Sequence, residues 1–211
     1  MTEQGCWHCG HPSEESLFCQ FCNHLLRPTP DYYRFLDMPR RLSVDPDDLQ
    51  QRFYKMSRLV HPDRFTRGAA VEKQNSLEAT AILNDAYRTL RDPVLRAEYV
   101  LKENGFDIGE QRTKDVPPEL LEEVFELNMA LEELRGGDED ARGPLEESKK
   151  KFVAMRDSID SELEQLFIAH DKTTTVKDAH EALQAIRGVL NRRRYIRNLV
   201  ETVNKELAVS H

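Results

Sequence analysis

Glycine is scarce in this chain, with 9 among 211 residues, and runs of alternating β-branched residues are nearly absent. Strands are built from such runs, so a fold based on a β-sheet is excluded, while the abundant polar helix formers favour helices. Apolar runs are short, and none approaches the roughly 20 residues that a membrane-spanning helix needs. The composition therefore predicts an all-α protein with no membrane partner.

An excess of positive charge is also missing. The chain has 30 Lys and Arg against 38 Asp and Glu, a net charge of −8. A chain of this sign has no general attraction for nucleic acid or for an anionic membrane, so we expect neither as a partner. The first residues have neither the layout of a signal peptide nor the Arg-rich, acid-poor character of a transit peptide. The expected location is the cytoplasm, or the mitochondrial matrix for the mature form of a eukaryotic protein.

Cysteine is absent after residue 22, and all four cysteines form two close pairs, Cys6-x-x-Cys9 and Cys19-x-x-Cys22. Two such pairs can place four thiolates around Zn(II), and a closed set of four favours a structural role over catalysis. Disulfides would suit a secreted chain and redox chemistry would need a βαβ context, and neither is indicated. We predict a structural zinc knuckle over residues 1–27, with three nearby histidines facing solvent and not serving as ligands: His8, His11 and His24.

A tripeptide, His61-Pro62-Asp63, interrupts a helical pattern that opens at the start signal Asp45-Pro46. Proline cannot continue a helix and pushes the residue before it out of the helical region. His61 and Asp63 are therefore expected on a loop between two helices, where polar groups usually serve a partner. The second helix should end at Asp92-Pro93.

Apolar spacing predicts which face of each helix is buried. The first helix should bury Leu49, Phe53, Met56 and Val60, and the second should bury Leu77, Ala81, Leu83, Asn84, Tyr87 and Leu90. Basic residues lie off the first of these stripes. Together with one more after the loop they form a positive patch suited to an acidic groove on a partner: Arg52, Lys55, Arg58 and Arg64.

A His-Pro-Asp loop bracketed by two such helices resembles the J-domain of DnaJ-type co-chaperones, expected here over residues 31–103. The resemblance implies a DnaK-type partner whose ATP hydrolysis is triggered by the loop and the basic patch: His61, Pro62, Asp63, Arg52, Lys55, Arg58 and Arg64. No enzyme activity is expected on this chain. A His/Asp pair could belong to a catalytic triad, but no Ser or Cys nucleophile comes with a recognisable turn.

Residues 113–208 have the pattern of three helices with short connections, which predicts a small three-helix bundle. The helices are expected from Pro117-Pro118 to Gly136-Gly137, from Pro144 to about His170, and from Thr175 onward, with residues 136–143 as a loop. The first of them has a regular seam for the core: Leu120, Val124, Leu127, Leu131 and Leu134. A second apolar stripe diverges from that seam, where polar residues are expected: Leu121, Phe125 and Met129. A protein-binding patch is the favoured interpretation, with a wide core face as the alternative.

The segment from Leu95 to Leu101, followed directly by a helical bundle, looks like the HscB family of iron–sulfur cluster co-chaperones. That family binds an IscU-type scaffold, delivers it to an HscA/DnaK-type chaperone and stimulates its ATPase, which promotes cluster assembly and transfer. The family's scaffold-binding pattern falls here on Leu121, Phe125, Glu126 and Tyr195. Two positions depart from it: Glu122 stands where an apolar residue is often found, and Met129 replaces an acidic one. The four-cysteine knuckle is similar to that of the animal mitochondrial members.

A different class of function also fits the sequence. The zinc ribbon could recruit another client, protein or nucleic acid, to a general DnaK-type chaperone. A basic cluster, Arg192-Arg193-Arg194 with Arg197, has no run of aromatic residues alternating with the basic ones for stacking bases, so we expect a solvated helix face there. Self-association and the role of the knuckle beyond stability stay open at this level.

Overall fold

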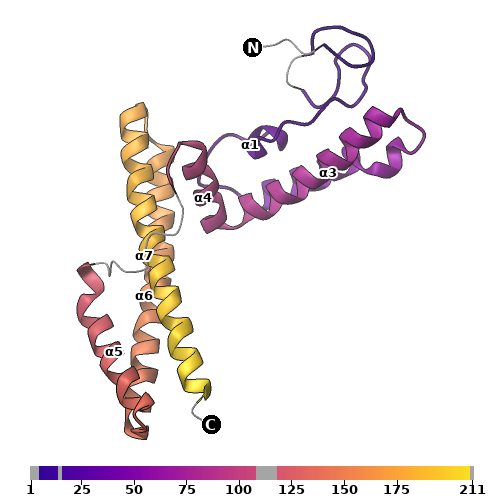
Figure 1. Ribbon diagram of the computed structural model, residues 1–211. Helices are drawn as coiled ribbons and strands as arrows, with labels where there is room; N and C mark the ends of the chain where they lie inside the picture. Colours follow the sequence, from indigo (N-terminus) through magenta and orange to yellow (C-terminus); the bar gives the residue numbers. More distant parts are fainter. Residues whose placement is uncertain (1–4, 14–15, 108–117, 210–211) are drawn as a thin grey trace. The chain divides into compact units, whose positions relative to one another are not determined.

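The computed structural model describes residues 5–13, 16–107 and 118–209, and Figure 1 shows an irregular N-terminal segment followed by helices. The all-α prediction is confirmed for these residues, whose only β-structure is two isolated bridges near the cysteines. None of the helices in these ranges is long and apolar enough to cross a membrane. The chain divides into two compact units, Met1–Tyr99 and Val100–His211, called here the hairpin unit and the bundle unit.

The hairpin unit is built on two packed antiparallel helices. Its elements are α1 (Tyr32–Phe35), α2 (Pro46–Val60), the 3₁₀ turn η1 (Pro62–Phe65) and α3 (Ala70–Arg91), and α4 (Pro93–Glu103) begins at its end. The predicted start of α2 is confirmed, because the Asp45 carboxylate caps it by accepting from the backbone N–H of Asp47 at 2.9 Å. Leu49 and Val60 are buried as expected.

The buried face of α3 differs from the expected one. Leu77 is 56% exposed, and Ala81 and Asn84 are exposed as well. The prediction is confirmed for Leu83 and Leu90, and the rest of the seam consists of smaller residues: Asn75, Ser76, Ala79 and Ala86. Small side chains let neighbouring elements approach closely, and Ser76 can be buried because its hydroxyl donates to the Val60 carbonyl at 2.6 Å.

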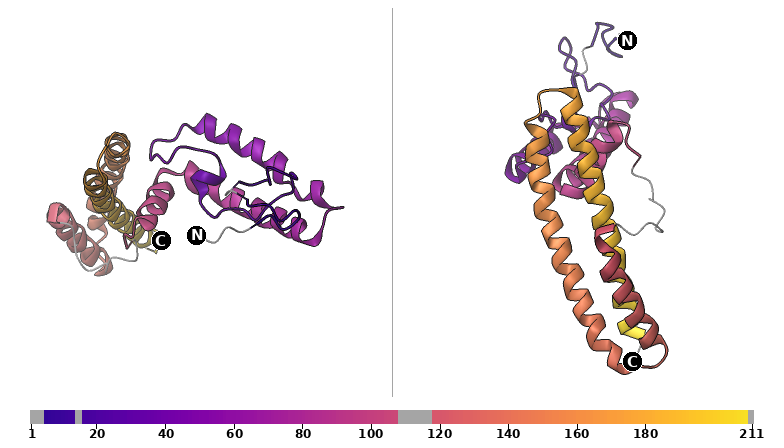
Figure 2. Two further views of the ribbon diagram at one scale, coloured as in Figure 1. Left: turned by 90° about the horizontal axis from the view of Figure 1, so that it is seen from above. Right: turned by 90° about the vertical axis from the view of Figure 1, so that its left-hand side faces the viewer.

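The bundle unit contains three longer helices, α5 (Leu121–Arg135), α6 (Arg142–Asp171) and α7 (Val176–Val209), preceded by the short turn η2 (Pro118–Leu120). Figure 2 shows α6 and α7 side by side with α5 along them. The segment 136–143, expected as a loop, contains a 3₁₀ turn, η3 (Glu139–Ala141). Its start is fixed by the Asp138 carboxylate, which accepts from the Asp140 N–H at 3.0 Å.

Ion pairs tie the three helices together. Arg193 pairs with Asp160 at 2.6 Å and Arg192 with Glu162, joining α7 to α6. Arg135 at the end of α5 pairs with Glu206 of α7. Arg192 and Arg193 are half-buried, so the expectation of a solvated helix face is wrong for them. Both guanidinium groups form ion pairs between α7 and α6 of the same unit.

Candidate functional sites

The two cysteine pairs fold into matching turns. Each pair is followed by a residue with positive φ, Gly10 at 72° and Asn23 at 57°, and then by a histidine. In both turns the N–H of this residue donates to the carbonyl of the pair's first cysteine, at 2.9 Å and 2.8 Å. The signal for this symmetry is a six-residue repeat, Cys-x-x-Cys-Gly/Asn-His, which the sequence analysis missed.

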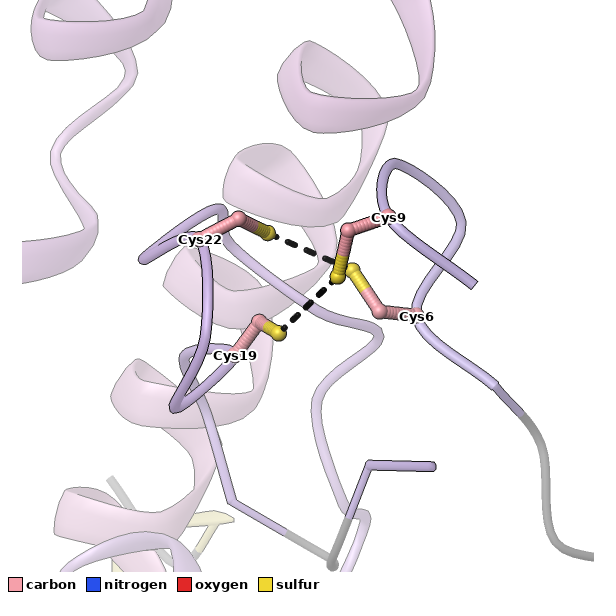
Figure 3. Close-up of side chains that lie close together, drawn as sticks. All are labelled: Cys6, Cys9, Cys19 and Cys22. Carbon is pink, nitrogen blue, oxygen red and sulfur yellow. Dashed lines mark hydrogen bonds between the residues drawn. The ribbon is translucent and has the colours of Figure 1, made fainter. Parts of the chain in front are cut away.

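The four sulfurs converge on one point, as Figure 3 shows. Cys6 Sγ lies 3.6 Å from Cys22 Sγ, and Cys9 Sγ lies 3.7 Å from Cys19 Sγ. Four sulfurs about 2.3 Å from one tetrahedral ion are separated by about 3.8 Å, so the donor set fits a single ion. All four are free cysteines, and the expected gathering of the four thiols into a cluster that could hold a metal ion is confirmed.

Backbone N–H groups contact all four thiols and lower the pKa of Cys6 and Cys19, while burial and the neighbouring thiols raise the pKa of Cys9 and Cys22. The N–H of Cys22 points at Cys19 and lowers the pKa of its thiol to about 6. The N–H of Cys9, followed by that of His8 at 3.4 Å, lowers the pKa of Cys6. Because the thiolate is the metal-binding form, these contacts favour the state that a metal needs.

The knuckle is fastened to the helical hairpin through Leu25, which is fully buried. The Leu25 carbonyl accepts from Trp7 Nε1 at 2.9 Å and from Asn75 Nδ2 of α3 at 3.0 Å. The Leu25 N–H donates to Glu72 of α3 at 3.1 Å. Knuckle and hairpin therefore belong to one unit.

The His-Pro-Asp loop is held in shape and exposed. α2 ends at Val60, and the N–H of Asp63 donates to His61 Nδ1 at 3.3 Å, which starts η1. Arg64 donates across the turn to the Arg58 carbonyl at 3.1 Å. The side chains of His61 and Asp63 both face solvent. A polar pair presented in this way is available to a partner.

The four basic residues predicted for this site divide into two kinds. Arg52 is engaged within the unit, because its Nε contacts Asp48 at 2.9 Å and its guanidinium donates to the Leu36 carbonyl at 3.3 Å. The others are exposed: Lys55, Arg58 and Arg64. Tyr54, which the sequence analysis missed, is also exposed and lies on the same face of α2 as Lys55 and Arg58 at 100° per residue. Its position off the core stripe was the available signal.

The bundle unit exposes an apolar stripe on α5. Leu121, Phe125 and Met129 are 56%, 66% and 49% exposed. The seam expected to face the core is buried throughout: Leu120, Val124, Leu127, Leu131 and Leu134. A wide core face is therefore ruled out for the stripe, which offers its apolar area to solvent.

Tyr195 and Glu126 are the other two residues predicted for this surface. The Arg135–Glu206 pair fixes the level of α5 against α7, and the same offset places Tyr195 at the level of Phe125. Tyr195 is half-buried, and this burial raises the pKa of its hydroxyl. Glu126 is exposed, 3.8 Å from Lys151 of α6.

Comparison with known proteins agrees with this geometry. Residues 31–99 match the DnaJ domain and residues 116–204 match the HSCB C-terminal oligomerisation domain. The human iron–sulfur cluster co-chaperone HscB is 33% identical over 94% of this chain and 80% of its own length. The mouse protein is 34% identical over 76% of this chain and 70% of its own length.

Solved structures of HscB proteins are similar as well. The crystal structure of human HscB covers 96% of this chain and 98% of its own, with a TM-score of 0.70 and 29% identity. The structure of HscB from Vibrio cholerae covers 83% of this chain and 96% of its own, with a TM-score of 0.55 and 25% identity.

A helical hairpin with an exposed His-Pro-Asp loop and a matching domain model define a J-domain co-chaperone. Such a domain implies a partner of the Hsp70 class. The second matching domain and the relatives narrow the class, and the chain belongs to the HscB family of iron–sulfur cluster co-chaperones. This membership implies binding of a scaffold protein and a role as a co-chaperone, not an enzyme.

Proposed function

We infer that this chain binds an IscU-type scaffold on the bundle unit and delivers it to an HscA/DnaK-type chaperone whose ATPase the hairpin unit stimulates. The observation that carries this is the pairing, in one chain, of an exposed His-Pro-Asp loop with an exposed apolar stripe on a separate unit. One surface has the polar character of a docking loop, and the other has the apolar character of a client site.

The loop and the exposed cations act on the chaperone. Lys55, Arg58 and Arg64 attract an acidic groove at long range, and His61 and Asp63 add short-range hydrogen bonds after docking. Binding better to the hydrolysing conformation than to the resting one shifts the chaperone toward hydrolysis. Arg52 is a positioning residue in this scheme, since its guanidinium holds α2 against the segment that follows α1.

The stripe on α5 acts on the scaffold. Leu121 and Phe125 supply apolar area that a partner removes from water, at about 1.5–3 kcal/mol for each side chain that becomes fully buried. Glu126 beside them offers a charge at the rim, and Tyr195 at the same level of α7 offers a phenol. The exposure of Leu121, Phe125 and Glu126, with Tyr195 half-buried, supports this assignment.

Zn(II) is the metal we assign to the four cysteines, because four thiolates at this spacing suit a tetrahedral ion. Bound there, it would supply cross-links in place of a hydrophobic core. Its residues would be Cys6, Cys9, Cys19 and Cys22.

Scaffold binding tests the client surface. The double substitution Leu121→Ala and Phe125→Ala should weaken binding of an IscU-type scaffold by about 3 kcal/mol, over a hundredfold in Kd, measured by calorimetry. Ile168→Ala is the matched control, an apolar side chain 48% exposed on α6 of the same unit, and should leave Kd unchanged. ATPase stimulation without scaffold should be the same in all variants. Equal Kd values for the double variant and the wild type would overturn the assignment.

A further inference from the structure

Two histidines beside the four-cysteine cluster lie face to face. The rings of His8 and His24 have centroids 3.8 Å apart and planes within 14°. The Trp7 ring stands edge-on to both, with its centroid 5.6 Å from that of His8 and 5.3 Å from that of His24. His8 is exposed and His24 half-buried, so the stack sits at the surface of the knuckle and not in a core.

Cys22 brings a sulfur to this pair. Ligand atoms of His8, Cys22 and His24 all lie within 4.8 Å of one another. His24 Nδ1 is 3.1 Å from the Cys22 carbonyl oxygen. A carbonyl only accepts, so Nδ1 carries the proton and Nε2 keeps its lone pair. A hydrogen bond from one ring nitrogen that orients the other is typical of metal-binding histidines.

The donor set selects a class of ion. Two imidazole nitrogens and one thiolate suit borderline-soft divalent metals such as Zn(II) and Co(II), whereas Mg(II) and Ca(II) prefer oxygen. Ligands 2.0–2.3 Å from one tetrahedral ion lie about 3.3–3.8 Å apart. The stacked rings lie in nearly parallel planes, so the exposed His8 ring must turn out of the stack for both imidazoles to bind one ion.

We propose that His8, Cys22 and His24 form a second site for a borderline-soft divalent cation, which shares the Cys22 sulfur with the four-cysteine site. The proposal rests on the zinc–thiolate cluster proposed above, since four thiolates around a divalent ion leave a net charge of about −2 that attracts another cation. Sharing one sulfur couples the two sites. A metal held by the histidines therefore stands one ligand away from the cluster and gives it a route for metal exchange.

A Co(II) titration of the reduced, metal-free chain tests this site by absorption spectroscopy. Excess Mg(II) occupies exposed carboxylates, so that only nitrogen and sulfur sites respond. His8→Ala with His24→Ala removes the proposed ligands. His11→Ala is the matched control, because His11 holds in the first repeat the place of His24 in the second but stacks on Phe21 at 4.4 Å. His8→Gln alone changes an exposed side chain and serves if the double variant does not fold.

The wild type and the His11 variant should bind two equivalents of Co(II). Binding of the second equivalent should change the thiolate absorption bands that the first one produces. The histidine variants should bind one equivalent with an unaltered first spectrum. Saturation of the wild type at one equivalent, or a second equivalent retained without the histidines, would overturn the proposal. Failure of the first equivalent to give a tetrathiolate spectrum would instead contradict the four-cysteine assignment as well.

Discussion

At the scale of single residues, the Leu25 carbonyl shows how few atoms hold the knuckle on the hairpin. It accepts one hydrogen bond from Trp7 within the knuckle and one from Asn75 of α3. Asn75 is buried, so a lost donor there leaves polar groups without water to replace it. The contact joins residues 50 positions apart in the chain.

Asn75→Ala should lower the free energy of unfolding of the chain by about 1–2 kcal/mol, because it removes a buried hydrogen bond. Asn84→Ala, on the exposed face of the same helix, should change it by less than about 0.5 kcal/mol. Urea unfolding of both variants measures the difference. Equal decreases in the free energy of unfolding for the two variants would contradict a stabilising role of the Asn75–Leu25 hydrogen bond.

Residue patterns predicted the knuckle only in part. Cysteine spacing alone indicates a four-thiolate site, since the chemistry of Cys-x-x-Cys pairs is local. The expectation that His8 and His24 merely face solvent missed their stacking, because that contact joins the two repeats across 16 residues. The contact of Leu25 with α3 could not be predicted from the sequence either, because it joins residues that only the tertiary fold brings together.

At the scale of helices, local signals predicted ends better than faces. The cap at Asp45 is decided by side chains two and three residues away, so the start of α2 followed from the sequence. The buried face of α3 did not, because an apolar count favours Leu77 over Ser76. Ser76 is buried only because the end of α2 supplies an acceptor. The prediction of a solvated face was wrong for Arg192 and Arg193 for the same reason, because their ion-pair partners lie on α6.

The link between α5 and α7 should depend on pH. The hydrogen bond from Arg135 lowers the pKa of Glu206 in the folded chain below the value of about 4.3 of an unfolded one. A lowered carboxyl pKa gives stability that is fully present above the unfolded pKa and is lost as pH falls through the folded pKa.

Glu206→Gln should therefore destabilise the chain at pH 7 and make no difference at a pH below the folded pKa of Glu206. Glu181→Gln is the control, because Glu181 pairs with the exposed Lys177 one turn away on α7, a surface pair that contributes little. Thermal unfolding followed by circular dichroism across the pH range compares the three chains. A gap between wild type and Glu206→Gln that persists at acid pH would contradict this reading of the ion pair.

At the scale of the whole molecule, the chain joins a segment with a very small apolar core to helices that have larger apolar cores of their own. The knuckle's core is little more than Cys6, Cys19 and Leu26 with the residues packed on them. The bundle unit buries large side chains on all three helices, such as Leu127, Phe152 and Ile186. Among the described parts the knuckle has the smallest apolar core, so a bound metal would contribute most to its stability.

Removal of metal by a chelator should unfold the knuckle and leave the helical signal nearly intact. The chain has a single tryptophan, Trp7, whose indole donates to the Leu25 carbonyl, so its fluorescence should shift to longer wavelength as the ring meets water. Far-ultraviolet circular dichroism, dominated by α3, α6 and α7, is the internal control. Unchanged Trp7 emission after complete metal removal would show that the knuckle holds its shape without a metal.

The central claim is that one chain couples scaffold capture to chaperone ATPase, and steady-state ATPase of an HscA-like chaperone with and without an IscU-type scaffold tests it most directly. The wild type should stimulate hydrolysis, and the scaffold should increase that stimulation further. His61→Gln should abolish stimulation while leaving scaffold affinity unchanged, because His61 belongs to the other unit from the apolar stripe. Stimulation that ignores the scaffold, or that survives His61→Gln, would contradict the account.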